Sequence, residues 1–160
     1  MSKVLVVYHS ETGNTKKMAE AVAEGVREVD GVTVEIKSVE NASEKDLVEA
    51  DGIILGAPTY FGQMSAKMKE FIDKSISVWQ RLEGKVGAAF TTSLWEVGGN
   101  ETALLSMVYA MLCHGMVIVG QIDRFGCYGA CGFSSPSKEQ LAAARKLGRK
   151  VAETVKKLKG

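Results

Sequence analysis

The sequence predicts an α/β fold: an open sheet of five parallel strands with helices on both faces. Apolar runs of strand length alternate five times with helical patterns, which is typical of right-handed strand–helix–strand units. Two runs, 53–57 and 116–119, show no polar alternation, as expected of strands covered on both faces. The length of 160 residues fits one domain spanning 1–160.

Each element has its own signal along the chain. Strands are expected at five apolar runs, near 3–8, 32–38, 52–57, 86–91 and 116–122. Apolar residues that recur every three or four positions predict helices near 14–29, 64–78, 100–113 and 137–158. A shorter, polar helix near 43–49 would join the second and third strands. Pro58 and Pro136 lie at breaks between elements, where they interrupt no helix.

The turn between the first strand and the first helix predicts an anion-binding site. The N–H groups of a first helical turn lack partners within the helix, and the helix dipole favours negative charge there. Gly13 lets the backbone approach a ligand closely, and its neighbours add polar side chains. An N-capped helix without a ligand is the alternative. The turn consists of Ser10, Glu11, Thr12, Gly13, Asn14 and Thr15.

The composition of this turn also indicates which anion it binds. It lacks the Gly-x-x-x-x-Gly-Lys-[Ser/Thr] pattern of triphosphate sites and the Gly-x-Gly-x-x-Gly pattern of dinucleotide sites. Neutral donors around a tight turn suit one terminal phosphate. A mononucleotide such as FMN fits that description.

Two further loops should leave the same edge of the sheet, because they follow the third and fourth strands. Ligands of open α/β sheets bind beyond the carboxyl ends of the strands. Tyr60 and Phe61 would stack on a flat ring or, alternatively, pack on the neighbouring helix. Trp95 would cover the ring or serve as an exposed loop anchor. The expected contact residues are Pro58, Thr59, Tyr60, Phe61, Gly62, Thr91, Thr92, Ser93, Leu94, Trp95, Gly98 and Gly99.

Charge and cysteine content exclude several classes of function. The formal net charge is +1, and no stripe of basic and aromatic residues indicates a nucleic-acid partner. No apolar stretch is long enough to span a membrane, and the short polar start before the first strand leaves no room for a signal peptide. The three cysteines do not form a disulfide framework, so the cytoplasm is the expected location.

Residues 6–15, together with Ala19 and Val22, resemble the FMN fingerprint of flavodoxins. The rest of the chain resembles the WrbA family of flavodoxin-like NAD(P)H:quinone oxidoreductases. The segments that carry this second resemblance are 57–65, 98–102 and 113–119. The resemblance implies a flavodoxin-like sheet in the strand order 2-1-3-4-5. It also implies bound FMN that takes hydride from NAD(P)H and passes electrons to a quinone.

The resemblance assigns roles to two residues outside the three loops. Trp79 would line the substrate site, and His114 would act near the flavin. The predicted topology puts both at the amino ends of the strands, so they would serve the FMN of a neighbouring subunit. A homo-oligomer, either a dimer or a tetramer, is therefore expected. Segments that help to build a tetramer in the family are short here. A His114 at a helix C-terminus, favoured there by the dipole, is the alternative.

An electron carrier is the competing function. Carriers of the flavodoxin type dock with redox partner proteins through a charged face. Residues 137–160 hold eight Lys or Arg and two Asp or Glu, which leaves the remainder of the chain net negative. Direct oxidation of NADH and the assembly state would separate an enzyme from a carrier.

Overall fold

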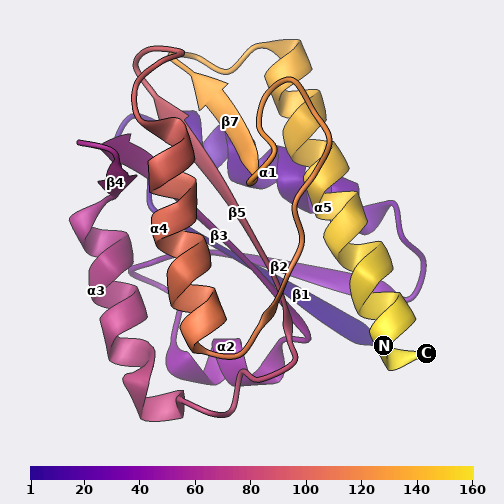
Figure 1. Ribbon diagram of the computed structural model, residues 1–160. Helices are drawn as coiled ribbons and strands as arrows, with labels where there is room; N and C mark the ends of the chain where they lie inside the picture. Colours follow the sequence, from indigo (N-terminus) through magenta and orange to yellow (C-terminus); the bar gives the residue numbers. More distant parts are fainter.

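Strands and helices alternate along the chain in the computed structural model, which describes residues 1–160 (Figure 1). In chain order the elements are β1 (Ser2–Tyr8), α1 (Asn14–Arg27), β2 (Val32–Ser38), α2 (Glu44–Glu49), β3 (Gly52–Tyr60), β4 (Gln63–Met64), α3 (Ala66–Lys74), a 3-10 turn (Ser75–Val78), β5 (Val86–Ser93), α4 (Asn100–Cys113), β6 (Val117–Ile118), β7 (Ala130–Phe133) and α5 (Lys138–Lys159).

The sheet has the order β2-β1-β3-β5-β6, and these strands are all parallel. This is the predicted order, since β5 and β6 are the expected fourth and fifth strands. β4 adds a short antiparallel pair with the end of β3. The order reverses between β1 and β3, so a crevice opens beyond the carboxyl ends of these strands.

The fifth strand differs from the prediction of one strand near 116–122. β6 pairs with the start of β5, and β7 pairs with its end, both in parallel. The chain between them leaves the sheet and returns at Gly129. A Cβ at Gly129 would lie 2.1 Å from the carbonyl oxygen of Ala89, so only glycine fits this close approach to β5. In the excursion the Gln121 N–H donates to the carbonyl oxygen of Cys127 at 3.1 Å and not to β5, so strand pairing stops after β6.

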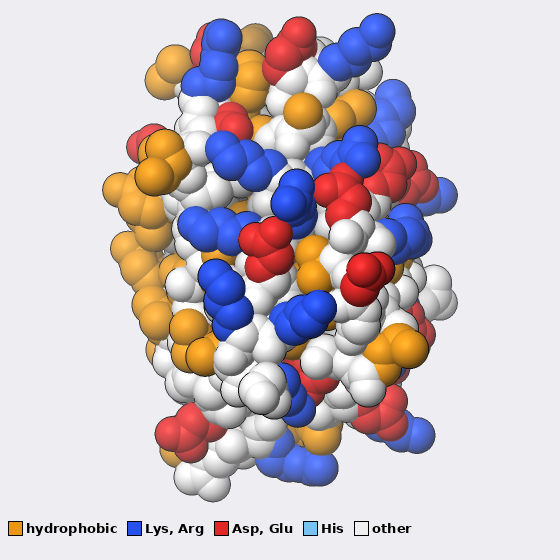
Figure 2. All heavy atoms as spheres, turned by 90° about the vertical axis from the view of Figure 1, so that its right-hand side faces the viewer, with side chains coloured by type: hydrophobic (Ala, Val, Ile, Leu, Met, Phe, Trp, Pro, Cys, Tyr) orange, Lys and Arg blue, Asp and Glu red, His pale blue; other side chains and the backbone are white.

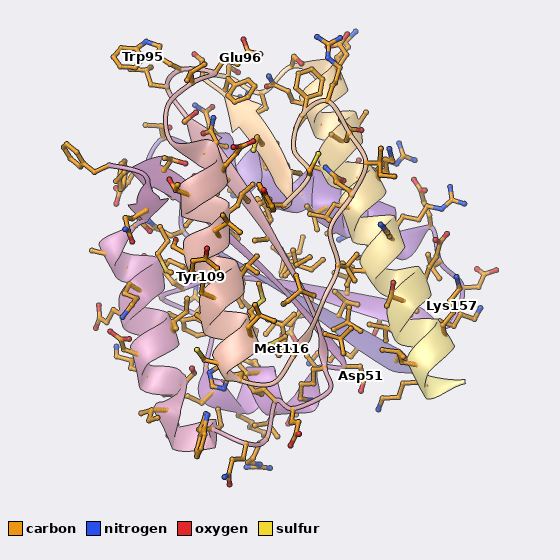
Figure 3. The ribbon with its side chains drawn as sticks, in the orientation of Figure 1. Asp51, Trp95, Glu96, Tyr109, Met116 and Lys157 are labelled. Carbon is orange, nitrogen blue, oxygen red and sulfur yellow. The ribbon has the colours of Figure 1, made fainter.

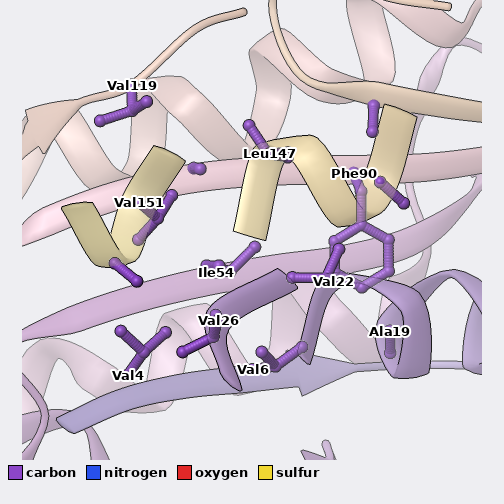
Figure 4. Close-up of a cluster of buried hydrophobic side chains, with 14 of the residues drawn as sticks. Val4, Val6, Ala19, Val22, Val26, Ile54, Phe90, Val119, Leu147 and Val151 are labelled. Carbon is purple, nitrogen blue, oxygen red and sulfur yellow. The ribbon is translucent and has the colours of Figure 1, made fainter. Parts of the chain in front are cut away.

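Two buried clusters hold the helices on the two faces of the sheet. On one face α1 and α5 pack against the strands, where Val22 and Leu147 meet Ile54 and Phe90 (Figure 4). On the other face α2, α3 and α4 cover Leu5, Val7, Ile53 and Leu55 among other residues. Neighbouring residues of β1 thus face opposite clusters, which explains its uninterrupted apolar run.

Candidate functional site

A cavity of about 400 Å³ lies at the carboxyl edge of the sheet, beyond β1, β3 and β5. The three loops singled out in the sequence converge on it. Its lining residues are Glu11, Thr12, Asn14, Thr15, Pro58, Thr59, Tyr60, Thr92, Ser93, Leu94 and Ser134. All of them except Ser134 were predicted as site residues.

The N-terminus of α1 forms one wall of the cavity. Gly13 precedes the helix at φ 95°, a left-handed conformation that favours glycine, and its N–H donates to Ser10 Oγ at 3.1 Å. No side chain caps α1, and its first turn holds no acidic residue. The N–H groups of that turn are therefore available to an anion in the cavity.

Threonine hydroxyls join the three loops beneath the cavity. Thr15 Oγ1 and Thr92 Oγ1 are 2.7 Å apart, which joins the first loop to the end of β5. Thr91 Oγ1 donates to the carbonyl oxygen of Ala57 at 2.7 Å and accepts from Thr59 Oγ1 at 2.7 Å. These bonds connect the second loop to β5. The floor of the cavity is thus fixed by the protein itself.

Two glycines pack against each other at the rim. Gly62 has φ 73° and Gly99 has φ 88°, so both lie in the left-handed region. A Cβ on Gly99 would lie 2.8 Å from Gly62 Cα, which no ordinary side chain allows. The second and third loops can approach each other this closely because residue 99 is glycine, whereas a Cβ on Gly62 would meet the Thr102 hydroxyl. Gly98, which directly precedes Gly99, lies on the same third loop.

His9 supports the cavity without lining it, and the sequence analysis gave it no role. It is buried, and its Nδ1 lies 2.7 Å from Ser65 Oγ, while its Nε2 lies 2.8 Å from Glu11 Oε1. Ser65 caps α3, so His9 joins the first loop to the segment after the second loop. A polar residue directly after a buried strand was the available signal. Together with the threonine bonds, His9 completes a set of links among the three loops.

Ser134 was missed because β7 was not predicted. It follows β7, has φ 51°, and its N–H donates to the carbonyl oxygen of Ser93 at 2.7 Å. The short run 130–133 followed by Ser134, Ser135 and Pro136 was the available signal for a strand and a turn.

Large apolar side chains surround the mouth of the cavity. Tyr60 lines it and is half exposed, whereas Phe61 is fully exposed at φ 52°, a strained backbone conformation for a bulky residue. Leu94 and Trp95 project from the third loop, where Trp95 is 71% exposed and stands at the end of the molecule (Figure 3). Phe61 and Trp95 contact no core cluster, so they are free to cover a bound ring or a docked substrate.

Trp79 and His114 lie at the opposite end of the sheet. His114 directly follows α4, whose other end starts with Asn100, beside Thr59 of the second loop. In Figure 3 Met116, two residues after His114, is far from Trp95. Neither Trp79 nor His114 lines the cavity of its own chain.

The side chains of Trp79 and His114 differ in their exposure to solvent. His114 Nε2 lies 2.7 Å from Ser75 Oγ, its Nδ1 is buried without a partner, and burial lowers its pKa. Trp79 is half exposed, and its Nε1 donates to the carbonyl oxygen of Cys113 at 3.2 Å. Trp79 therefore presents an aromatic surface outward, while the His114 nitrogens face inward.

The structure contains neither a cluster of metal ligands nor a membrane-spanning helix, and one of its cysteines is buried. No group of three or more His, Cys, Asp or Glu residues could hold a metal ion. Cys131 is buried, which raises the pKa of its thiol to about 12. None of the helices combines the length and the apolar character that crossing a bilayer requires.

The family follows from comparison with known proteins. The family model of the flavodoxin domain matches residues 5–117. The chain belongs to the flavodoxin family. A flavodoxin-family relative named NAD(P)H dehydrogenase (quinone), from Archaeoglobus fulgidus, is 40% identical, and the alignment covers 99% of this chain and all of the relative. A protein named flavodoxin, from Aquifex aeolicus, is 43% identical over 97% of this chain and 88% of its own.

Solved flavodoxin structures agree with the fold. A flavodoxin, WrbA-like protein from Agrobacterium tumefaciens superposes with a TM-score of 0.84 at 34% identity, covering 98% of this chain and 99% of the other. The alignment with the Archaeoglobus relative runs over 190 positions, so that relative carries segments that this flavodoxin-family chain of 160 residues lacks.

Proposed function

We propose that this flavodoxin-family protein binds FMN in the cavity and uses it to reduce quinones with NAD(P)H. The observation that carries the proposal is the cavity itself. Uncapped N–H groups and neutral hydroxyls form one end, and Tyr60 and Leu94 form the other. This donor set fits a molecule with a single phosphate at one end and a flat ring at the other.

The residues of each loop would have separate tasks. The first turn of α1, with Thr12 and Asn14, would bind the phosphate through N–H and side-chain donors. Tyr60 and Trp95 would exclude water from the ring and orient it, while backbone N–H groups of the Gly98–Gly99 segment would bind the polar edge of the ring. When bound, FMN supplies the hydride chemistry, and the protein supplies position and electrostatics.

The names of the relatives support a quinone reductase. Proteins named NAD(P)H dehydrogenase (quinone), from Archaeoglobus fulgidus and Methylocella silvestris, are 40% identical to this chain. The flavodoxin from Aquifex aeolicus favours the electron carrier as a second candidate, because it is 43% identical and its alignment of 162 positions needs few insertions relative to this chain.

Anaerobic titration of the purified holoprotein with NADH separates the two candidates. Rapid loss of the flavin colour, followed by its return on addition of a benzoquinone, is expected for the reductase. A flavin that NADH leaves oxidised, but that a reductase protein can reduce, would support the carrier instead. Protein that purifies without FMN and does not bind added FMN would refute both.

The in-trans roles of Trp79 and His114 belong to the same proposal, and α4 supports them. Its 14 residues include only one charged residue, Glu101, and Tyr109 and Leu112 are exposed on it. Hydrophobic side chains form a column along the left edge of Figure 2, which corresponds to the front of Figure 1, the face that α4 shares with the loop between β6 and β7. A helix that is apolar on both faces is expected to be covered.

A second copy packed on this side would place the half-exposed Trp79 at the interface, and dimers or tetramers with closed symmetry are expected. Sedimentation combined with activity tests this part of the proposal. Trp79→Ala should retain FMN and lose quinone reduction, and the activity should fall on dilution. A monomer with full activity would overturn the in-trans roles.

The cytoplasmic location and the absence of a nucleic-acid partner also stay predictions.

A further inference from the structure

Glu11 is the one acidic or basic residue among those that line the cavity. Its carboxylate lies on the side of the first loop that faces α3. Glu11 Oε1 is 2.8 Å from His9 Nε2 and 3.6 Å from Lys67 Nζ. Lys67 Nζ is also 3.6 Å from Glu40 Oε1. The carboxylate is thus held by two groups outside the cavity.

The hydrogen bonds of His9 define its tautomer. A carboxylate only accepts, so His9 Nε2–H donates to Glu11. His9 Nδ1 then accepts from the Ser65 hydroxyl, whose oxygen accepts from the N–H of Met68 at 3.4 Å. Ser65 and Met68 belong to the first turn of α3, so His9 is oriented by a fixed element. The hydrogen bond from His9, followed by the charge of Lys67, lowers the pKa of Glu11.

A charged carboxylate next to a phosphate site creates an electrostatic problem. The phosphate of FMN is anionic and would repel a carboxylate turned toward it, although solvent around the half-exposed Glu11 side chain screens this repulsion in part. The first turn of α1 supplies no basic side chain to the cavity wall, since Lys16 and Lys17 are exposed and do not line it. The position of the Glu11 carboxylate therefore matters for phosphate affinity.

We infer that His9 is a positioning residue that, with Lys67, holds the Glu11 carboxylate against α3 and away from the phosphate of bound FMN. This inference rests on the proposed FMN site. It assigns His9 a role in discriminating FMN from riboflavin. Of these two flavins, only FMN carries a phosphate that the Glu11 carboxylate can repel.

Flavin binding to apoprotein, measured by fluorescence quenching at low salt, tests the inference. His9→Phe fills a similar volume but removes both hydrogen bonds, and it should weaken FMN binding roughly tenfold, the scale of one lost charge-assisted hydrogen bond. His9→Gln keeps a donor near Nε2 and should bind FMN nearly as the natural protein does. Glu11→Gln should bind FMN at least as tightly as the natural protein.

The double variant separates this role from simple support of the fold. His9→Phe combined with Glu11→Gln should regain the lost FMN affinity, because the repelling charge is gone. Riboflavin, which has no phosphate, should bind to His9→Phe and to the natural protein with equal affinity. If His9→Phe loses riboflavin as well as FMN, or if Glu11→Gln does not rescue it, His9 only supports the fold and the inference is wrong.

Lys67 provides a test in an exposed residue, in case His9→Phe does not fold. Lys67→Met should weaken FMN binding when Glu11 is present and leave it unchanged beside Glu11→Gln. Lys69→Met is the matched control, since Lys69 pairs with Asp73 on the same helix and does not contact Glu11. Equal effects of Lys67→Met and Lys69→Met would overturn the inference. Natural protein that binds neither flavin would instead refute the proposed FMN site itself.

Discussion

Thr15 Oγ1 and Thr92 Oγ1 lie 2.7 Å apart, although 77 positions separate the two residues in the chain. Thr15 belongs to the first turn of α1, and Thr92 belongs to the end of β5. Both side chains are buried, so each hydroxyl depends on the other for its hydrogen bond. The pair fixes the distance between the proposed phosphate-binding turn and the strand that carries the third loop.

Thr15→Val should therefore weaken FMN binding and lower stability together. The variant keeps the shape of the side chain but leaves Thr92 unpaired, which costs about 1–3 kcal/mol. Chemical denaturation of apoprotein measures the stability, and fluorescence titration measures the affinity. Thr33→Val is the control, because its hydroxyl makes an exposed bond to the Ser2 carbonyl oxygen and lies far from the cavity. Equal losses in both variants would contradict the role of the Thr15–Thr92 pair.

Gly99→Ala should destabilise the protein more than Gly31→Ala. Both glycines have positive φ, 88° and 82°, so both variants bear the backbone cost of about 1 kcal/mol. Only at Gly99 would the new Cβ also collide with Gly62 Cα, since the space around Gly31 is open. Thermal denaturation should show the larger loss for Gly99→Ala, and FMN affinity should fall in that variant alone. Equal stabilities would show that the two loops can separate at no cost.

Asp46 should make stability depend on pH in the acidic range. Burial would raise its pKa, but hydrogen bonds from Lys37 and Ser43 outweigh burial and lower it to about 2. Because the folded-state pKa lies below the unfolded value, the stabilisation is complete above about pH 4 and is lost as pH falls toward about 2.

Asp46→Asn tests this dependence. The variant should be less stable than the natural protein by about 1–2 kcal/mol at pH 7, and the difference should shrink below about pH 4 and vanish only below about pH 2. Urea denaturation at several pH values measures it. A difference that is constant with pH would mean that packing, and not the charge of Asp46, sets the effect.

The three thiols should react at different rates. Cys113 and Cys127 are exposed, whereas Cys131 is buried and its pKa is raised to about 12. A thiol reagent at pH 8 should therefore modify two cysteines quickly in the native protein and the third only after unfolding, because the thiolate is the reactive form. Peptide mapping identifies the sites. Fast modification of Cys131 would show that β7 opens readily.

The sequence by itself determined the class of fold and predicted most of the residues that line the candidate cavity. Apolar periodicity predicted the helices and the strands β1, β2, β3 and β5, because each of these elements buries its own apolar residues. The turn at Ser10–Thr15 was recognisable because its chemistry is local: a glycine and hydroxyls at a helix start. The loops after β3 and β5 followed from the rule that strand ends of a parallel sheet meet at one edge.

Only the tertiary structure decided the rest. The break between β6 and β7 depends on the close approach of Gly129 to Ala89, a contact between segments 40 positions apart, and the place of Ser134 depends on that break. In the sequence His9 directly follows the predicted strand 3–8, and no local pattern gives it a role. Its role comes from Ser65, 56 positions away, which no local pattern connects to it. Hydrogen bonds and backbone contacts of this kind act over about 3 Å in space. They join residues far apart in the chain and produce no periodic pattern in the sequence from which they could be predicted.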